Sequence, residues 1–276
     1  MPYLAVSDGT KIYYEDHGSG EAVLFCHGLQ SSHLKIKNFI NEFKGGCRCI
    51  CYDHRGHEAS ERSGKHMNIQ TLGRDLRELI EYLRLDNITV IGHSMGAAAI
   101  FSYIKQFGCE HLKRIVAVDM SPYMRNSVWD GGIGQGKWQD EDFLQDLERI
   151  FDDIGSANWY ITKKLMNPAL AASVPEAMES SMAALCGIGC DALTMASLWF
   201  SLFRTDFRPV ISEISVPFLY IMPEYPLYSM TAVNFIKEHV KSRFVLEKDI
   251  PGTTHTILME KPHETAERIK AFMNLE

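Results

Sequence analysis

The sequence predicts an α/β fold with a mostly parallel, eight-stranded sheet flanked by helices. From about residue 22 onward, short apolar runs alternate with longer segments of helical periodicity, which is typical of parallel strands joined by helical crossovers. The runs at 88–91 and 115–118 are apolar without interruption, as expected for strands covered on both faces. The 276 residues, 46% of them hydrophobic, can bury a large core as one domain.

The elements are expected in the following order. β-rich runs at 3–6 and 11–15, separated by the turn signal Asp8-Gly9, predict an antiparallel hairpin. Apolar runs predict further strands at 22–26, 50–53, 88–91, 115–118, 216–222 and 243–247. Helices are expected at 31–43, 69–83, 229–240 and 262–273, and Asn68 is placed to cap the second of them.

Residues 122–205 interrupt this alternation. They lack obvious buried strands and carry helical patterns, for example at 140–151 and 175–185. We therefore expect a helical cap of residues 122–205, inserted after the sixth strand into a core formed by 1–121 and 206–276. The segment contains all four tryptophans and several methionines: Trp129, Trp138, Trp159, Trp199, Met166, Met178, Met182 and Met195. These side chains either line an acyl or aromatic pocket or pack the cap onto the core.

The pentapeptide Gly92-His93-Ser94-Met95-Gly96 lies between the apolar run at 88–91 and a small-residue run at 97–100. This order of strand, sharp turn and helix is what a nucleophile elbow needs, with the serine lifted out of the sheet. Glycines on both sides allow the tight bend and close packing of helix on strand. Ser94 is therefore the candidate nucleophile.

The seven cysteines are an odd number, which favours free thiols in a reducing compartment over a disulfide framework. Cys47, Cys49 and Cys51 alternate along a predicted strand and share one face, so they cannot readily surround a metal ion, and no metal site is predicted. We interpret them as small buried hydrophobic residues, and we interpret Cys186 and Cys190 in the same way.

Charge and segment patterns limit the partners and the compartment. The net charge of −7 argues mildly against nucleic acid or an anionic membrane as a partner. The first residues have neither a basic region nor a long apolar stretch, and no apolar run reaches transmembrane length. We expect a cytoplasmic protein without a membrane span.

Four motifs, in this order, resemble those of the α/β-hydrolase superfamily, in particular its serine esterase and cofactor-free haloperoxidase branch. His27-Gly28 follows the third predicted strand, the Asp-His-Arg-Gly-His stretch at 53–57 follows the fourth, the Ser94 pentapeptide the fifth, and the Pro-Gly-Thr-Thr-His stretch at 251–255 the eighth. The resemblance covers essentially the whole chain. It implies that His255 is the general base and that no cofactor is needed.

The same resemblance implies which backbone groups stabilise the oxyanion. In the family these are the amide after the nucleophile and one in the loop after the third strand, which correspond to Met95 and Leu29. His93 and His27 occupy structural positions of their motifs, so neither is expected to be the base. One departure is Glu58, which stands where a second glycine is usual and suggests a reshaped turn.

The acid of the triad is the main departure from the pattern. In most relatives it follows the seventh strand, but here the corresponding position is Tyr225. Glu224 is adjacent to that position, although successive side chains near a strand end point in opposite directions. Asp119 ends the sixth strand, at the edge where active sites of open α/β sheets gather. We favour Asp119 over Glu224.

The expected function is that of a serine hydrolase that cleaves a carboxylic ester or a related acyl bond through an acyl-enzyme. The expected partner is a small-molecule acyl substrate with an apolar or aromatic portion. Alternatives are a cofactor-free haloperoxidase or perhydrolase, a lactonase, a thioesterase and, as a different class, a non-catalytic small-molecule receptor. The sequence leaves the substrate and the oligomeric state open.

Overall fold

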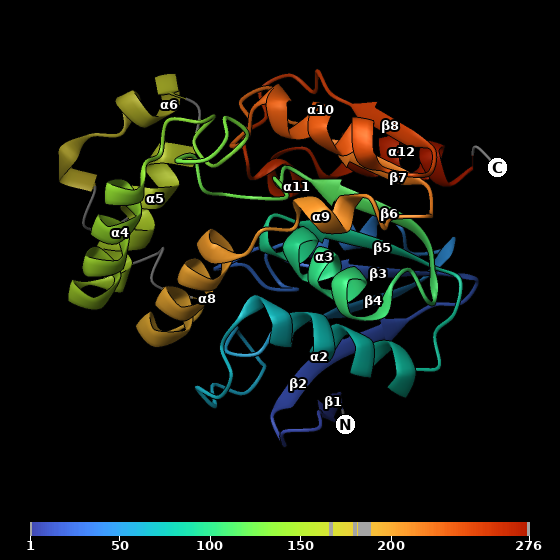
Figure 1. Ribbon diagram of the computed structural model, residues 1–276. Coiled ribbons are helices and arrows are strands. Elements are labelled where there is room, and N and C mark those ends of the chain that lie inside the picture. The colour runs from blue at the N-terminus through green and yellow to red at the C-terminus, as the bar shows by residue number, and fades with distance from the viewer. Residues whose placement is uncertain (1, 166–167, 179–180, 182–188, 275–276) are drawn as a thin grey trace.

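A computed structural model describes residues 2–165, 168–178, 181 and 189–274 (Figure 1). Met166, Met182, Cys186 and most of the helix expected at 175–185 lie outside these residues. The strands are β1 (Tyr3–Ala5), β2 (Lys11–His17), β3 (Glu21–Cys26), β4 (Cys47–Tyr52), β5 (Ile88–His93), β6 (Leu112–Val118), β7 (Phe218–Ile221) and β8 (Phe244–Glu247). They form one eight-stranded sheet in the order β1-β2-β4-β3-β5-β6-β7-β8.

The sheet has the predicted direction of strands. β1 pairs antiparallel with β2, and β2 pairs antiparallel with β4. The pairs from β4 through β3, β5, β6 and β7 to β8 are all parallel. The predicted hairpin and the mostly parallel eight-stranded sheet are therefore confirmed. Because the carboxyl ends of parallel strands meet at one edge, the loops after β3, β4, β5 and β6 are brought together there.

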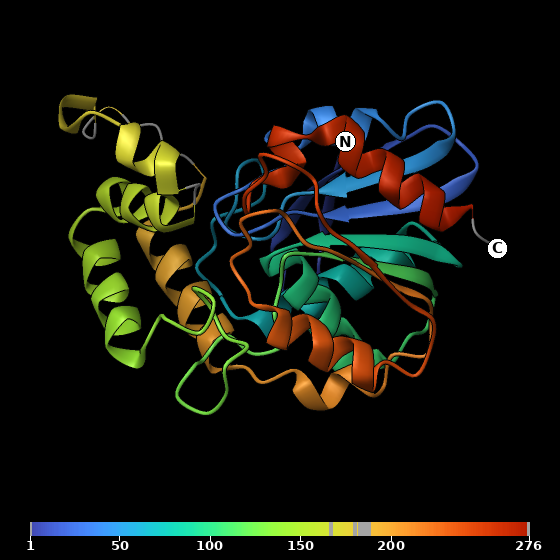
Figure 2. The same ribbon diagram turned by 90° about the horizontal axis from the view of Figure 1, so that it is seen from above.

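Helices cover both faces of the sheet. They are α1 (Lys37–Asn41), α2 (Ile69–Tyr82), α3 (Met95–Phe107), α9 (Arg208–Ile211), α10 (Met230–His239), α11 (Ile257–Glu260) and α12 (Pro262–Met273). One apolar core joins the sheet to α2, α3, α9 and α10, and a second joins the opposite face to α1, α11 and α12. Figure 2 shows α12 and α3 on opposite sides of the sheet.

The segment between β6 and β7 forms helices, as its sequence pattern predicts. They include α4 (Asp140–Asp152), α5 (Ile154–Leu165), α6 (Pro168–Ser173) and α8 (Ala192–Arg204), which lie to one side of the sheet (Figure 1). α4 packs on α8, where the rings of Phe143 and Phe203 stack with centroids 3.8 Å apart. Trp138, Trp159 and Trp199 are buried, which favours the packing role for these three side chains.

One predicted element is wrong at its beginning. The helix expected at 31–43 is shortened to α1, Lys37–Asn41. The residues before it form a loop because their backbone groups bond elsewhere: the N–H of His33 donates to the Asp53 carboxylate at 2.8 Å. Within the described part of the chain, no helix combines the length and apolar composition needed to cross a bilayer.

Candidate active site

Ser94 lies at a sharp turn between β5 and α3. Its backbone has φ 52° and ψ −120°, a strained conformation for a residue with a side chain. The glycines on either side are required by contact: a Cβ on Gly92 would lie 2.5 Å from the backbone nitrogen of Ala97, and one on Gly96 would lie 2.1 Å from the carbonyl oxygen of Cys26. The local sequence thus folds as the nucleophile-elbow pattern predicts.

The structure brings Ser94, His255 and Asp119 into one hydrogen-bonded line. Ser94 Oγ lies 2.9 Å from His255 Nε2, and His255 Nδ1 lies 2.7 Å from Asp119 Oδ2. Asp119 is fully buried and His255 is 6% exposed. With Nδ1 donating to the carboxylate, Nε2 of the neutral ring is free to accept the serine proton. The arrangement has the geometry of a nucleophile, a base and an orienting acid.

Asp119 is aimed at His255 by its own backbone and by a second donor. It follows β6 with φ 45°, so the chain turns sharply at the end of the strand. Its Oδ2 atom also accepts the backbone N–H of Leu227 at 2.9 Å. A carboxylate held by a backbone amide keeps its direction, and this lets it fix the orientation of the imidazole.

Glu224, the alternative acid, has a different place. Its carboxylate accepts the backbone N–H of Gly252 at 2.7 Å, in the loop that carries His255. From the other side of that loop, Glu260 accepts the N–H of Thr254 at 2.7 Å and its hydroxyl at 2.6 Å. Two glutamates therefore hold the histidine loop, while the carboxylate that contacts the ring of His255 belongs to Asp119.

His93 supports His255 from the elbow. Its Nε2–H donates to the carbonyl oxygen of His255 at 2.6 Å, and the two rings lie with centroids 4.9 Å apart. Burial lowers the pKa of His93 to about 3, so the ring stays neutral at physiological pH. This placement agrees with the structural role predicted for His93.

Leu29 and Met95, whose backbone N–H groups are the predicted oxyanion donors, belong to segments that adjoin the nucleophile. Met95 follows Ser94 directly, and a Cβ on Gly28 would lie 3.3 Å from Cβ of Ser94, so the loop after β3 contacts the elbow. The hydrogen bonds of the described residues leave both N–H groups without an acceptor. Two free amides beside a serine could bind a developing oxyanion.

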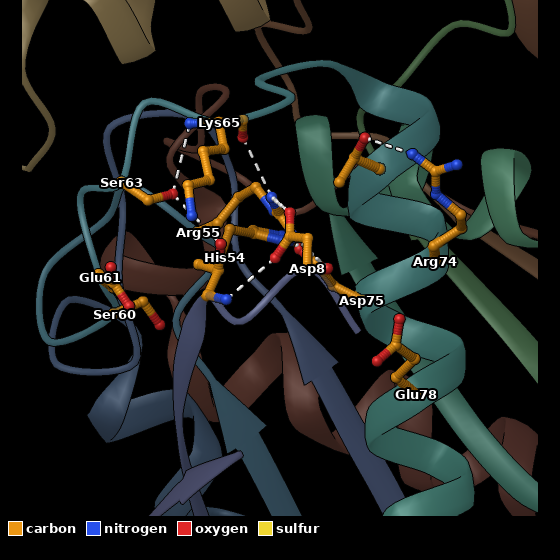
Figure 3. A network of polar contacts seen from close by, with 12 residues as sticks. Asp8, His54, Arg55, Ser60, Glu61, Ser63, Lys65, Arg74, Asp75 and Glu78 are labelled. Atoms are coloured by element: carbon orange, nitrogen blue, oxygen red, sulfur yellow. Dashed lines mark hydrogen bonds and ion pairs between the residues drawn. The ribbon is translucent and has the colours of Figure 1, made fainter. Parts of the chain in front are cut away.

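The turn after β4 is anchored by a buried ion pair. Arg55 lies between Asp8 and Asp75 (Figure 3). It donates to both Asp75 oxygens at 2.6 Å, to Asp8 at 2.7 Å and to the carbonyl of Lys65 at 3.1 Å. Paired carboxylates on both sides compensate the buried guanidinium and fix the path of the turn.

Residues 56–58 of this turn contact the start of α8. Glu58 adopts φ 41°, so it keeps the left-handed conformation that the usual glycine would take, and its N–H donates to the carbonyl of Gly189 at 3.0 Å. A Cβ on Gly56 would lie 2.6 Å from the side chain of Thr194. The end of the helical insertion therefore packs on the same edge of the sheet as Ser94.

Three buried histidines join the loops after β3 and β4, a contact that the sequence did not predict. His27, His54 and His57 are each fully buried, with ring centroids of His27 4.5 Å from His54 and 5.2 Å from His57. The sequence places His27 directly after the third strand, and His54 and His57 directly after the fourth. Their contact could not be inferred without the pairing of β3 with β4.

The cysteines of β4 lack the features of a catalytic or metal-binding site. Cys49 and Cys51 are buried in the core under α1 and α12, and burial raises the pKa of their thiols to about 11 and about 12. A thiol with so high a pKa is a poor nucleophile at neutral pH. Among the residues that the structure describes, no group of three or more His, Cys, Asp and Glu side chains could hold a metal ion.

Comparisons with known proteins agree with this fold. Residues 21–151 match the family model of the alpha/beta hydrolase fold. The chain is 27% identical, over 93% of its length and 94% of the relative's, to a Synechocystis sp. protein named after the non-heme chloroperoxidases. It is 24% identical, over 81% of its length and 82% of the relative's, to the bifunctional esterase/perhydrolase DCH of Acinetobacter calcoaceticus.

A solved structure extends the agreement to the whole fold. The esterase EaEST from Exiguobacterium antarcticum superposes with a TM-score of 0.82 at 20% identity, covering 98% of each chain. Sheet order, a serine elbow after β5 and a matching family model lead to one conclusion. The chain has the α/β-hydrolase fold, and residues 21–151 match the family model of that fold.

Proposed function

We propose that the protein is a serine hydrolase that cleaves a carboxylic ester or a related acyl bond. The observation that carries the proposal is the unbroken line from Ser94 Oγ through His255 to Asp119, with hydrogen bonds of 2.9 and 2.7 Å. A serine hydroxyl needs a base within hydrogen-bond reach, and the base needs a group that fixes its tautomer. Both requirements are met by these contacts.

In this mechanism Ser94 attacks the acyl carbon while His255 Nε2 takes the hydroxyl proton. The carbonyl oxygen becomes an oxyanion that accepts hydrogen bonds from the N–H groups of Leu29 and Met95, each worth roughly 3 to 4 kcal/mol of barrier. His255 then returns the proton to the leaving alcohol, and the acyl group stays on Ser94. Water, activated by His255, releases the acid and restores the serine.

The helices between β6 and β7 lie next to the loops that surround Ser94. We propose that the helices between β6 and β7, residues 122–205, form a cap that shapes the acyl pocket above Ser94, with an apolar or aromatic portion of the substrate on its side. The contact of Met195 Sδ with Gln30 at 3.1 Å, beside Leu29, supports this placement. The free thiols of the described cysteines favour a cytoplasmic location.

The test is a panel of p-nitrophenyl esters of increasing acyl length, hydrolysed by the wild type, S94A and H255Q. We expect the wild type to turn over at least one ester, and both variants to lose about four or more orders of magnitude in kcat. S94A removes one oxygen atom from a partly exposed side chain, so an unchanged melting temperature controls for folding. Turnover that persists in S94A would overturn the proposal.

A second candidate is perhydrolysis at the same site, with peroxide-dependent halogenation as its consequence. The observation that favours it is the likeness, along most of the chain, to a protein named after chloroperoxidases and to an esterase/perhydrolase. Hydrogen peroxide would replace water: its oxygen attacks the acyl carbon, the acyl–serine bond breaks, and a peracid leaves with Ser94 restored. The peracid then oxidises a halide ion to hypohalous acid and becomes the carboxylic acid.

Peroxide and ester assays separate these two readings. Bromination of a phenol red indicator in acetate with hydrogen peroxide reports perhydrolysis, and ester turnover without peroxide reports hydrolysis. We expect ester turnover to dominate and both activities to vanish in S94A. Efficient bromination together with untouched esters would make perhydrolysis the function and hydrolysis the side reaction.

A further inference from the structure

The loop that carries Leu29 is held by a buried imidazole on each side of this residue. On the first side, His27 Nδ1–H donates to the carbonyl oxygen of Gly28 at 2.7 Å, and the Ser31 N–H donates to the same oxygen at 3.1 Å. This carbonyl belongs to the peptide unit whose N–H is that of Leu29. Because a peptide is planar, with its N–H and C=O pointing in opposite directions, holding the oxygen also sets the direction of the N–H.

On the second side, the next peptide unit is held by His57. The N–H of Gln30 donates to His57 Nε2 at 3.3 Å, and His57 Nδ1–H donates to the carbonyl of Arg55 at 3.2 Å. Gln30 has φ 59°, a left-handed conformation that a glutamine rarely adopts without support. With the peptides before and after Leu29 both bonded to histidines, both backbone dihedrals of Leu29 are restrained.

His27 donates a hydrogen bond to the loop backbone, whereas His57 accepts one from it, and both rings must be neutral. His27 donates through Nδ1 and accepts the His54 N–H through Nε2 at 3.0 Å, so its tautomer is fixed. His57 must accept through Nε2, which a protonated ring cannot do. Burial lowers the pKa of His27 well below its ordinary value and lowers that of His57 to about 4.

Burial keeps His57 neutral, while the charged groups around it act in both directions. Asp53, on the same turn, favours the protonated ring, whereas Lys35 from the loop after β3 and Arg62 from the turn after β4 oppose it. Neutral His27 and His54 complete the surroundings. The ring is fully buried, so it exchanges no hydrogen bond with solvent.

We propose that His27 and His57 are positioning residues, which aim the N–H of Leu29 at the oxyanion formed on Ser94. The inference rests on the proposed function, because it assigns a purpose to the N–H only in an acyl-transfer reaction. It goes beyond the triad in that two histidines outside it determine how well the transition state is bound. The bond from His27 to Gly28 also polarises the peptide, which makes its N–H a better donor.

The test replaces His57, whose bond to Gln30 can be removed and restored. H57F keeps an aromatic ring but removes the acceptor of the Gln30 N–H and the donor to the Arg55 carbonyl, while H57Q places a carboxamide oxygen near the position of Nε2, where it can accept the Gln30 N–H. The control is D75N, which weakens the Arg55 anchor of the same turn without touching Gln30 (Figure 3). All three are assayed with the best p-nitrophenyl ester, together with their melting temperatures.

A misaimed oxyanion donor weakens binding of the transition state more than binding of the ester. We therefore expect H57F to lower kcat about 10- to 100-fold with KM changed less than about threefold, since loss of a whole donor costs about 100- to 1,000-fold. H57Q should recover most of this loss. D75N should lower the melting temperature and leave kcat, measured well below that temperature, within about twofold of the wild type.

Three outcomes would overturn the inference: an H57F enzyme with the wild-type kcat, H57Q and H57F enzymes that are equally impaired, or a D75N enzyme that loses kcat as H57F does. The last would show that general loosening of the turn is enough. Failure of the proposed function is a separate result, since it appears as absence of Ser94-dependent turnover in the wild type itself.

Discussion

At the scale of single residues, the carboxylate of Asp119 orients the base of the proposed reaction. It contacts His255 Nδ1 at 2.7 Å and is fully buried, so no water can replace it. An amide at this position would hold a neutral ring in either tautomer and could not stabilise the imidazolium. Replacing the carboxylates of Asp119 and Glu224 in turn therefore tests which of them orients His255.

We predict that D119N lowers kcat for ester hydrolysis by about four orders of magnitude, as expected when the acid of a triad becomes an amide. E224Q should lower kcat by no more than about tenfold. The side-chain oxygen of Gln can still accept the Gly252 N–H, although this bond, which holds the histidine loop, becomes weaker without the charge. Steady-state kinetics at pH 7.5 measures both. Equal losses in the two variants, or a larger loss in E224Q, would contradict the assignment of the acid.

The sequence allowed Asp119 to be favoured because carboxyl ends of neighbouring parallel strands meet at one edge, so an aspartate ending β6 lies near a loop following β8. The bond from His57 to Gln30 could not be inferred in this way. It depends on the left-handed backbone of Gln30 and on the exact approach of two loops, neither of which leaves a periodic pattern in the sequence.

At the scale of elements, the elbow between β5 and α3 depends on the absence of side chains. α3 approaches β3 so closely that a Cβ on Gly96 would lie 2.1 Å from the carbonyl oxygen of Cys26. Backbone cannot yield as a flexible side chain would, so the helix itself would have to move. This makes the glycine a structural condition for the position of Ser94.

We predict that G96A lowers the free energy of unfolding by about 2 to 4 kcal/mol and abolishes ester turnover even where the protein stays folded. Urea unfolding and kinetics on the folded fraction check the two effects. G108A is the matched control in a helix-ending glycine: its Cβ would meet nothing within 4 Å, although φ 69° adds strain, so activity should survive. An active G96A enzyme would contradict this account of the elbow.

The contact between α4 and α8 contains a buried carboxylate outside the proposed mechanism. Asp146 is 1% exposed, and among the described residues neither of its oxygens makes a hydrogen bond of good geometry. Burial raises its pKa to about 7, although Lys164, Trp199 and Trp138 act in the opposite direction. The folded state therefore binds the proton more tightly than the unfolded chain, whose aspartate has a pKa near 3.8.

It follows that ionisation of Asp146 destabilises the fold. The contribution of this carboxyl group to the free energy of unfolding should fall as the pH rises from about 4 to about 7, and level off above that. D146N cannot ionise, so its stability relative to the wild type should increase by on the order of 2 kcal/mol between pH 5 and pH 8. D152N, an exposed position on the same helix, is the control and should show little such change. Parallel pH profiles for D146N and wild type would rule the effect out.

At the scale of the whole molecule, the positions of the central strands along the chain follow from physical regularities that the sequence displays. Strands buried on both faces need uninterrupted apolar runs, and the runs at 88–91 and 115–118 fall within β5 and β6. The helix expected at 31–43 failed because tertiary hydrogen bonds, such as that from His33 to Asp53, took the backbone groups a helix would use. The periodicity of a short segment does not show whether its backbone groups bond within a helix or to distant residues.

The sequence located the insertion between β6 and β7, because the alternation of strands and helices stops there. The sequence did not predict how the insertion packs on the sheet. Residues of α8, among them Leu198 and Leu202, belong to the same apolar core as α2 and α3. The fold therefore has a sheet with two apolar cores, one of which continues into the helical insertion. That continuity brings Gly189 and Thr194 onto the turn after β4, close to the edge where Ser94 lies.

The central claim is that Ser94 is an activated nucleophile. Its most direct test is reaction with a fluorophosphonate, followed by the intact mass of the protein and mapping of the modified peptide. We expect a single adduct on Ser94 in the wild type, none in S94A, and much slower labelling of H255Q and D119N. A wild type that is not labelled, or an adduct that remains when Ser94 is replaced, would contradict it.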